Sequence, residues 1–311
     1  MGEQYCCPTF ASLGELVASS CQVDGVLIST PHKTHFELGM EAIAAGMNVL
    51  IEKPMTTTGE DAQTVVDAAK AAGKIFMVNT TANWREQTKA AAKMVEDGKL
   101  GEIRHVQLHM GSPLMMLFDD PTRTTWVEGV GKAGLNGFAW GQLSHPTSWL
   151  FKVTGLKPAE AFCFMGMSEN SGADLSDAAT VRCTNGATIS ISGTAMVPGV
   201  QGVGKQIDIK IYGDKGMLTF GGDDSDPSSG ELLLTSLDGS TESMSEFLFE
   251  DTTEPTDPGY GTGPASVTSF IDGCLGRPFF EGADVDTSQS VVQLLEAMYL
   301  SAKSGKAEKV A

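Results

Sequence analysis

The first 80 residues constrain the fold most strongly, because short apolar runs alternate there with amphipathic stretches. Three runs have the length and β-branched content of buried strands: residues 24–30 (DGVLIST), 48–53 (NVLIEK) and 74–80 (KIFMVNT). The segments before and between them have helical spacing, and the second and third end at glycine: residues 12–20, 35–46 and 59–73. Strands and helices that alternate at such short intervals predict βαβ units and a parallel sheet with helices on both faces.

The pattern changes after residue 102. A helix is predicted over 85–101, and beyond it apolar and polar residues alternate with the period of strands. These strands are expected within 103–111, 179–196 and 205–222, with hairpin turns at TNGA and GDKG, and as the short runs ELLLTS and SEFLFE in the polar stretch 222–263. A closing helix is expected over 290–305. The fold class is therefore α/β: a partial, Rossmann-type parallel sheet in residues 1–102, then a domain in 103–311 with a large open, mostly antiparallel sheet and a C-terminal helix that packs back.

Composition and charge restrict the partners. The formal net charge is −18 and the pI is about 4.6, so nucleic acid and anionic membranes would be repelled. No apolar run is long enough to cross a bilayer and no secretion signal is recognisable, so we expect a cytoplasmic protein without a membrane partner. The six cysteines include no C-x-x-C pair, so we expect reduced thiols and no metal site.

A charged tripeptide, Glu52-Lys53-Pro54, ends the second predicted strand. In open parallel sheets, ligands bind outside the carboxyl ends of the strands, so this tripeptide and the STPH turn after the first strand should face one crevice. Proline prevents the strand from continuing and directs the preceding residue outward, which would place the Lys53 ammonium at the mouth of the crevice. A solvated lysine at a surface strand end is the alternative interpretation.

The segment VLISTPHKTHFELGMEAIAAGMNVLIEKP resembles the Gfo/Idh/MocA family, the group of glucose–fructose oxidoreductase and inositol dehydrogenase. DGKLGEIRHV and the closing FIDGCLGRP and SVVQLLEAMYLSAKSGKAEKV extend the resemblance over nearly the whole chain. It implies a nicotinamide-binding Rossmann domain followed by a domain for substrate binding and oligomerisation. The implied reaction is oxidation or reduction of a secondary alcohol of a sugar, inositol or related compound with NAD or NADP.

The resemblance also implies roles for individual residues. Lys53 would lie beside nicotinamide and substrate and act as a catalytic residue. Thr30, Pro31 and His32 would line the dinucleotide, and Glu52 and Pro54 complete the cofactor-binding motif around Lys53. Association into a homo-oligomer through the open face of the second sheet is implied as well.

A second catalytic candidate is His145, in the segment GFAWGQLSHPTSWLF. Family members usually carry an acid four residues before this histidine, on the same helix face, but Gly141 stands there. Ser148 occupies another position that is often acidic. We therefore assign the acid–base role to His145, with Lys53, because an unperturbed histidine pKa near 6.5 suits proton transfer. A packed histidine at a helix N-terminus is the alternative.

Two further features qualify this interpretation. GVGKAG (residues 129–134) fits G-x-G-x-x-G, but polar residues precede it and no acid follows about twenty residues later. We therefore expect a flexible loop that leads into the His145 segment rather than a dinucleotide turn. The glycine-rich unit with which the family begins is not recognisable before Asp24, so we expect weak or no binding of NAD or NADP and an inactive short form as one outcome. The alternatives are a non-catalytic sugar- or partner-binding protein and a structural subunit that pairs with a full-length homologue.

Overall fold

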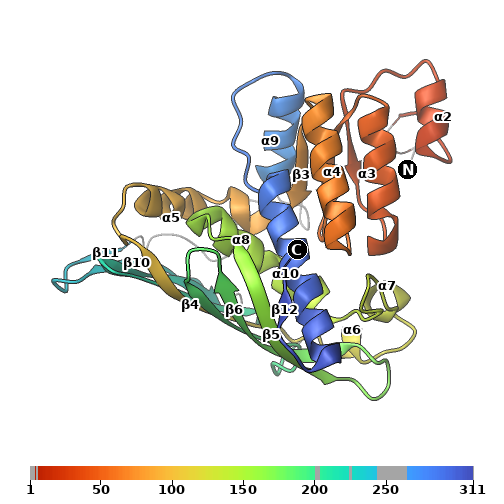
Figure 1. Cartoon of the computed structure of the whole chain (residues 1–311). Helices are drawn as coiled ribbons and strands as arrows, with labels where there is room; N and C mark the ends of the chain where they lie inside the picture. Colours follow the sequence, from red (N-terminus) through yellow and green to blue (C-terminus); the bar gives the residue numbers. More distant parts are fainter. Residues whose placement is uncertain (1–3, 5, 200–203, 224–225, 244–264, 311) are drawn as a thin grey trace.

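Two sheets and the helices packed on them make up the fold (Figure 1). The computed structural model describes residues 4, 6–199, 204–223, 226–243 and 265–310. The described N-terminal sheet is parallel, with the order β1-β2-β3, and its strands are β1 (Gly25–Ile28), β2 (Asn48–Glu52) and β3 (Phe76–Asn79). All three lie inside the predicted strands, and β2 in the middle has a fully buried centre, as its continuous apolar run requires.

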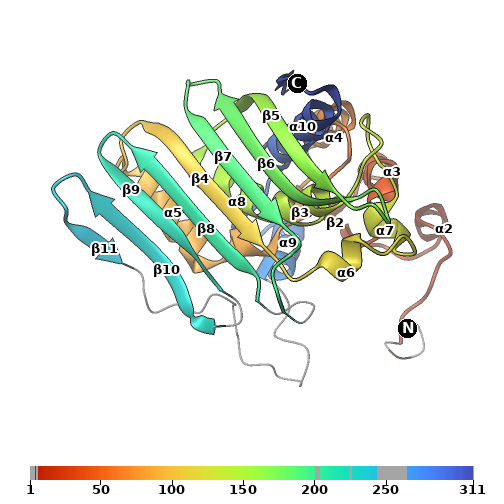
Figure 2. The ribbon, with the colours of Figure 1, turned by 90° about the horizontal axis from the view of Figure 1, so that it is seen from below.

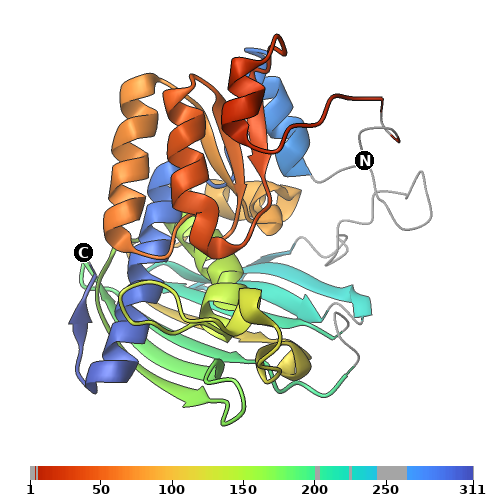
Figure 3. The same ribbon diagram turned by 90° about the vertical axis from the view of Figure 1, so that its right-hand side faces the viewer.

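Helices cover both faces of this sheet. The bounds are α2 (Leu13–Ala18), α3 (His35–Ala44), α4 (Gly59–Ala72) and α9 (Ala265–Cys274). The right-handed crossovers between consecutive parallel strands place α3 and α4 on one face. α9 lies on the opposite face (Figure 3) and packs so closely that a Cβ at Gly25 would lie 2.6 Å from the Phe270 ring.

The second sheet has nine strands among the described residues, in the order β11-β10-β9-β8-β4-β7-β6-β5-β12. Their bounds are β4 (Ile103–Gly111), β5 (Pro158–Met167), β6 (Asp174–Cys183), β7 (Thr188–Thr194), β8 (Gln206–Gly213), β9 (Gly216–Asp223), β10 (Asp226–Ser236), β11 (Thr241–Ser243) and β12 (Glu308–Lys309). Every neighbouring pair is antiparallel except β4 with β7, which confirms the mostly antiparallel sheet.

The sequence predicted some of the strands of this second sheet and missed others. Both predicted hairpins form, between β6 and β7 and between β8 and β9. ELLLTS lies within the longer β10, and β5, β11 and β12 were not predicted. SEFLFE lies outside the described residues. The predicted boundary between domains, at residue 102, stays a prediction.

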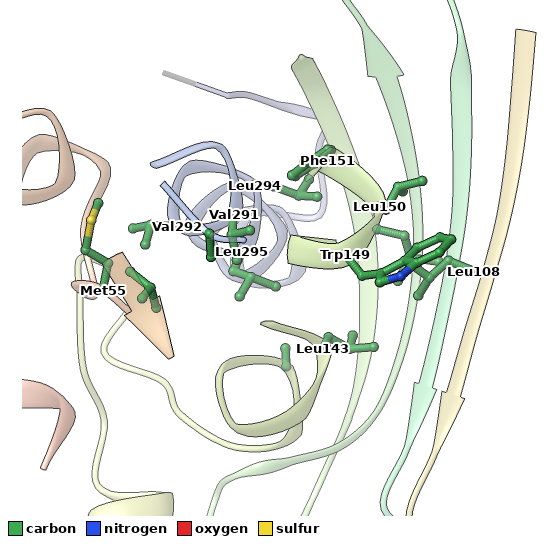
Figure 4. Close-up of a cluster of buried hydrophobic side chains, with 14 of the residues drawn as sticks. Met55, Leu108, Leu143, Trp149, Leu150, Phe151, Val291, Val292, Leu294 and Leu295 are labelled. Carbon is green, nitrogen blue, oxygen red and sulfur yellow. The ribbon is translucent and has the colours of Figure 1, made fainter. Parts of the chain in front are cut away.

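Helices lie on one face of the large sheet, and no helix of the described residues covers the other face (Figure 2). These are α5 (Glu86–Glu96), α8 (Ser144–Thr154) and α10 (Val285–Ser304). Figure 4 shows α8 and α10 side by side in the core, with Trp149 directed toward Leu108 of the sheet. Trp149 also stacks on Phe220, with ring centroids 4.2 Å apart. α8 is therefore held between the large sheet and α10, and this packing fixes the position of the side chains in its first turn.

The connection from β4 to α8 brings the second half of the chain to the parallel sheet. It contains α6 (Met115–Phe118), α7 (Thr124–Val127) and a π-helical turn, η3 (Ala139–Leu143), that continues directly into α8. Single 3-10 turns, η1 (His32–Thr34) and η2 (Thr81–Trp84), follow β1 and β3. The described part of the chain contains no helix with the length and apolarity that a bilayer crossing requires.

Candidate functional site

Lys53 lies where the carboxyl end of β2 meets the η3 turn. The sequence predicted an ammonium at the mouth of a crevice, but the side chain points inward and the residue is only 8% exposed. Nζ donates a hydrogen bond to the Gly141 carbonyl oxygen at 2.5 Å. Nζ also lies 5.3 Å from the centre of the Trp126 ring. Burial lowers the pKa of Lys53 to about 8, although the nearby Glu52 carboxylate opposes that shift. The amine can therefore gain and lose a proton near neutral pH.

Glu52 has a different partner. Its Oε1 accepts a hydrogen bond from Asn79 Nδ2 at 2.6 Å, and Asn79 Oδ1 in turn accepts from the Ser266 hydroxyl. The carboxylate thus links the end of β2 to the end of β3 and to α9, instead of pointing freely out of the sheet.

His35 joins the two strand ends that the sequence placed at one crevice. Nδ1 lies 2.7 Å from the Pro54 carbonyl oxygen and Nε2 lies 2.8 Å from the Thr30 carbonyl oxygen. Both partners only accept, so both bonds form when each ring nitrogen carries a proton. The spacing T-P-x-x-x-H is explained by this geometry, because the η1 turn returns the chain so that His35 reaches back to Thr30.

His32 contributes an unusual polar atom to this region. The ring is buried, and Nδ1 has no hydrogen-bond partner among the described residues. Burial, helped by the Lys53 and His35 charges, lowers the pKa of His32 to about 3, so the ring is neutral. Trp126 contacts it edge to face, with ring centroids 5.5 Å apart. A pocket of about 100 Å³ separates this turn from α7, and its lining includes Pro31, His32 and Lys33.

His145 is the second residue of α8 and is half-buried. The η3 turn runs directly into α8, so His145 lies within a continuous helical segment. Burial, followed by the charges of Lys53, Lys205 and Arg85, lowers its pKa well below 6.5. Lys53 is thus close enough for its charge to act on His145, which is a neutral imidazole at neutral pH. The catalytic roles of the two residues stay predictions.

Gly141, four residues before His145, contributes its backbone instead of an acid. A Cβ there would lie 2.8 Å from Phe118 Cζ and 3.6 Å from Trp126 Cε3, so no side chain fits. Ser148 is buried and accepts a hydrogen bond from Asn83 Nδ2 at 2.9 Å. The two positions where the family often has acids thus hold a carbonyl group facing Lys53 and a hydroxyl used within the core.

The sequence analysis did not identify Trp126 and Phe118 as residues near the site. Both come from the connection after β4, and both lie against Gly141, while Trp126 also contacts Lys53 and His32. A single tryptophan within the polar stretch TRTTWVEG was the available signal. GVGKAG forms a turn closed by the Val130–Leu135 bridge, and a Cβ at Gly131 would lie 2.3 Å from the Thr57 carbonyl oxygen. It is a loop and not a dinucleotide turn, as expected, but it is packed closely against Thr57 where a flexible loop was predicted.

The strand ends suit the nicotinamide end of a dinucleotide. His32 and Lys53 follow the carboxyl ends of β1 and β2, which is the usual place for such a ligand. The buried His32 Nδ1 has no partner among the described residues and could accept or donate a hydrogen bond to it. Thr30, Pro31 and Pro54 form the backbone turns around it. Among the described residues, no glycine-rich turn joins a strand to a helix N-terminus there, so the fit concerns the nicotinamide end only.

Comparisons with known proteins agree with this arrangement. Residues 1–80 match a family model described as "Oxidoreductase family, NAD-binding Rossmann fold", and residues 88–219 match the "GFO/IDH/MocA C-terminal domain". A scyllo-inositol 2-dehydrogenase (NADP(+)) of Bacillus subtilis (strain 168) is 26% identical over 157 residues, which are 50% of this chain and 42% of that protein. A D-xylose 1-dehydrogenase (NADP(+)) of Hypocrea jecorina is 40% identical over 95 residues, 30% of this chain and 23% of that protein. The matched regions thus span less than half of these curated relatives.

Solved structures share the fold across both halves. An NAD binding oxidoreductase from Klebsiella pneumoniae superposes with a TM-score of 0.75 at 19% identity, covering 100% of this chain and 86% of that one. An inositol dehydrogenase homolog from Azotobacter vinelandii, complexed with NADH and myo-inositol, gives a TM-score of 0.73 at 19% identity, covering 98% and 83%. Because models of both family domains match in order and the two-domain fold is the same throughout, the chain belongs to the Gfo/Idh/MocA oxidoreductase family.

Proposed function

We propose that the chain acts as an NAD(P)-dependent oxidoreductase on a secondary alcohol of a sugar, an inositol or a related polyol. The observation that carries the proposal is the buried Lys53 amine, which the Gly141 carbonyl holds beside a neutral His145. The inositol and xylose dehydrogenases among the relatives support the substrate class.

The two candidate residues divide the work differently from the sequence expectation. A pKa of about 8 makes Lys53 well matched to proton transfer near neutral pH, whereas the strongly lowered pKa of His145 makes it a weak base. Lys53 Nζ would therefore accept the hydroxyl proton during oxidation and return it during reduction. His145 would hold the hydroxyl in place through a hydrogen bond from its neutral ring.

The cofactor would lie against the turns after β1 and β2. Thr30, Pro31 and His32 would contact the nicotinamide riboside, with His32 Nδ1 as a polar partner, and Glu52 and Pro54 would shape the opposite wall. When bound, the nicotinamide supplies the hydride chemistry. The turnover experiment below compares NAD with NADP.

The proposal is tested by turnover with matched variants. The chain is incubated with myo-inositol, scyllo-inositol or D-xylose and with NAD or NADP, and the reduced nicotinamide is followed by absorbance. Lys53→Met should lower turnover by about 10²-fold or more, the usual contribution of a positioned acid or base. Lys93→Met removes an exposed α5 lysine that pairs with Asp97, so it serves as the control and should leave turnover unchanged.

The outcomes separate the alternatives. Lys53→Met with wild-type turnover would remove the proposed proton-transfer role. Binding of a polyol, seen as thermal stabilisation, without turnover for any pair of substrate and cofactor would favour the non-catalytic binding protein.

A further inference from the structure

A buried cluster beneath the η3 turn has no part in the chemistry described so far. It consists of Asp174 and Asp177 of β6 and Tyr299 of α10, which are 0%, 4% and 1% exposed. Alternation along a strand would send residues three apart to opposite faces. Here the pairing of β6 with β5 shifts register between Gly166 and Met167, so both carboxyl groups point inward.

Asp174 binds the start of the η3 turn. Its Oδ2 accepts the Ala139 backbone N–H at 2.7 Å, and its Oδ1 accepts the Tyr299 hydroxyl at 2.6 Å. The Tyr299 oxygen accepts the next backbone N–H, from Trp140, at 3.3 Å, and the Trp140 and Tyr299 rings stack with centroids 5.5 Å apart. Two consecutive amides of the turn are thus tied to one carboxyl group, directly or through the tyrosine.

The next residue of the turn is Gly141, whose carbonyl oxygen accepts the Lys53 hydrogen bond. Fixing the amides of residues 139 and 140 restricts where this carbonyl can lie. Asp174 and Tyr299 are therefore placed to position Lys53 without touching it or the substrate.

Asp177 explains how such a carboxyl pair can be buried. Neither Asp177 oxygen has a fixed donor among the described residues, yet its carboxyl group is within hydrogen-bonding reach of Asp174. A buried carboxylate without a donor is strongly disfavoured, and two adjacent carboxylates are not ionised together. A protonated Asp177 resolves both problems, because its O–H can then donate to Asp174.

The surrounding titratable groups agree with this state. Burial, then the Asp174 charge, raises the pKa of Asp177 well above its usual value. Tyr299 on α10 and Cys163 on β5 face the same pair, and burial followed by the two carboxyl groups raises the pKa of each, so both stay neutral. Burial raises the pKa of Asp174 as well, but its hydrogen bonds with Tyr299, Ala139 and Asp177 oppose that shift, so a single negative charge on the pair would lie on Asp174.

We propose that Asp177 is a neutral carboxylic acid that donates its proton to a hydrogen bond with Asp174, and that Asp177, Asp174 and Tyr299 together position the Gly141 carbonyl that holds Lys53. They are positioning residues. Only the consequence for catalysis rests on the proposed function; the hydrogen-bond arrangement does not.

Infrared spectroscopy tests the protonation state without any turnover. At neutral pH the wild-type protein should show the C=O stretch of a neutral carboxylic acid, and Asp177→Asn should weaken this band. Asp208→Asn is the control, because Asp208 pairs with Lys210 on the open sheet face. A neutral-acid band that is absent from the wild type, or unchanged in Asp177→Asn, would overturn the proposal.

Amide hydrogen exchange and lysine labelling test the positioning. Asp174→Asn should speed exchange of the amides of residues 139 and 140 by about tenfold or more, because a bond worth about 1.5 kcal/mol corresponds to that factor. Asp177→Asn keeps an N–H donor toward Asp174 and should leave both amides protected. Tyr299→Phe should expose chiefly the Trp140 amide, and it keeps the test decisive if Asp174→Asn does not fold.

The readout at Lys53 is its apparent pKa, measured from the pH dependence of labelling by an amine reagent. We expect about 8 in the wild type and in Asp177→Asn. In Tyr299→Phe and Asp174→Asn it should rise toward the ordinary lysine value, because a displaced turn admits water to a site whose shift comes mainly from burial. Unchanged labelling in both would show that the cluster stabilises the fold without positioning Lys53.

Discussion

At the scale of single residues, burial sets the chemistry of Lys53 more than any charged partner does. Its hydrogen-bond acceptor is the neutral carbonyl of Gly141, and desolvation is the largest cause of its lowered pKa. Replacing a carboxylate partner by a carbonyl removes a strong stabiliser of the ammonium form. The same burial, with the neighbouring cations, keeps His145 neutral.

A pH profile follows from these shifts. The neutral amine of Lys53 increases as the pH rises through about 8, so alcohol oxidation should rise with a midpoint there, and the reverse reduction should fall. Lys53→Arg should abolish this inflection, since arginine stays protonated. Initial rates of oxidation and reduction, measured from neutral to mildly alkaline pH in the wild type and in Lys53→Arg, test for this inflection. A limb near 6.5 that disappears in His145→Gln would instead assign the proton transfer to the histidine.

His35 should matter for stability in proportion to its two buried partners. His35→Leu leaves the Thr30 and Pro54 carbonyl oxygens without their shared donor, so the free energy of unfolding should fall by about 2–4 kcal/mol. His105→Leu is the matched control, because the His105 ring contacts Thr188 and Tyr212 at an exposed position. Urea denaturation of both variants measures the difference. Equal stability of the two would show that His35 does not hold the strand-end turns together.

At the scale of elements, the η3 turn and α8 form one continuous segment whose position depends on close packing. Phe118 of α6 is fully buried against the backbone of Gly141, and Asp174 lies against Gly137, where a Cβ would come 2.4 Å from Oδ1. The segment that carries Gly141 and His145 is thus shaped by glycines at its two tightest contacts.

Gly141→Ala tests this packing. The added Cβ meets the Phe118 ring, so unfolding free energy should fall by about 1–3 kcal/mol, the usual cost of overpacking. Gly14→Ala in helix α2 provides the control, because the nearest atom to its Cβ would be Glu41 Oε1 at an ordinary 3.5 Å. A double-mutant cycle with Phe118→Leu should recover part of the loss. Additive effects of the two changes would contradict the contact.

At the scale of the whole molecule, the large sheet buries one face and presents the other. Ile189 and Ile191 of β7 point into the core, whereas Thr188 and Ser190 point to the face that no described helix covers (Figure 2). Small polar side chains on a broad sheet surface can pair with a second copy, and we propose a homo-oligomer assembled through this face.

Sedimentation at micromolar concentration tests the assembly. The wild type should sediment as a dimer or larger species, and Ser190→Arg with Thr180→Arg, two exposed cross-strand neighbours, should dissociate it. Glu96→Arg, on the exposed side of α5, is the control and should leave the mass unchanged. A monomeric wild type would refute the proposal.

Neighbouring residues were enough to predict the local elements of the N-terminal sheet and its helices. Thr58 caps α4 by accepting the Asp61 backbone N–H, Gly73 ends the helix in the left-handed conformation, and the run from Val49 to Ile51 forms a buried strand. These outcomes depend on neighbouring residues, so periodicity and capping were sufficient. The predicted order of strands and helices also places the Thr30–His32 turn and Lys53 at the same edge of the parallel sheet. The roles of these residues stay predictions.

The direction and the environment of the functional groups depend instead on contacts between distant segments of the chain. Lys53 points inward because Gly141, 88 residues later, supplies its acceptor, and Trp126 reaches the site through a connection whose sequence is mainly polar. Asp174 and Asp177 share a face because β6 shifts register against β5. Such contacts join segments far apart in the chain, and the pKa of a buried group follows from that surrounding and not from its own sequence neighbours.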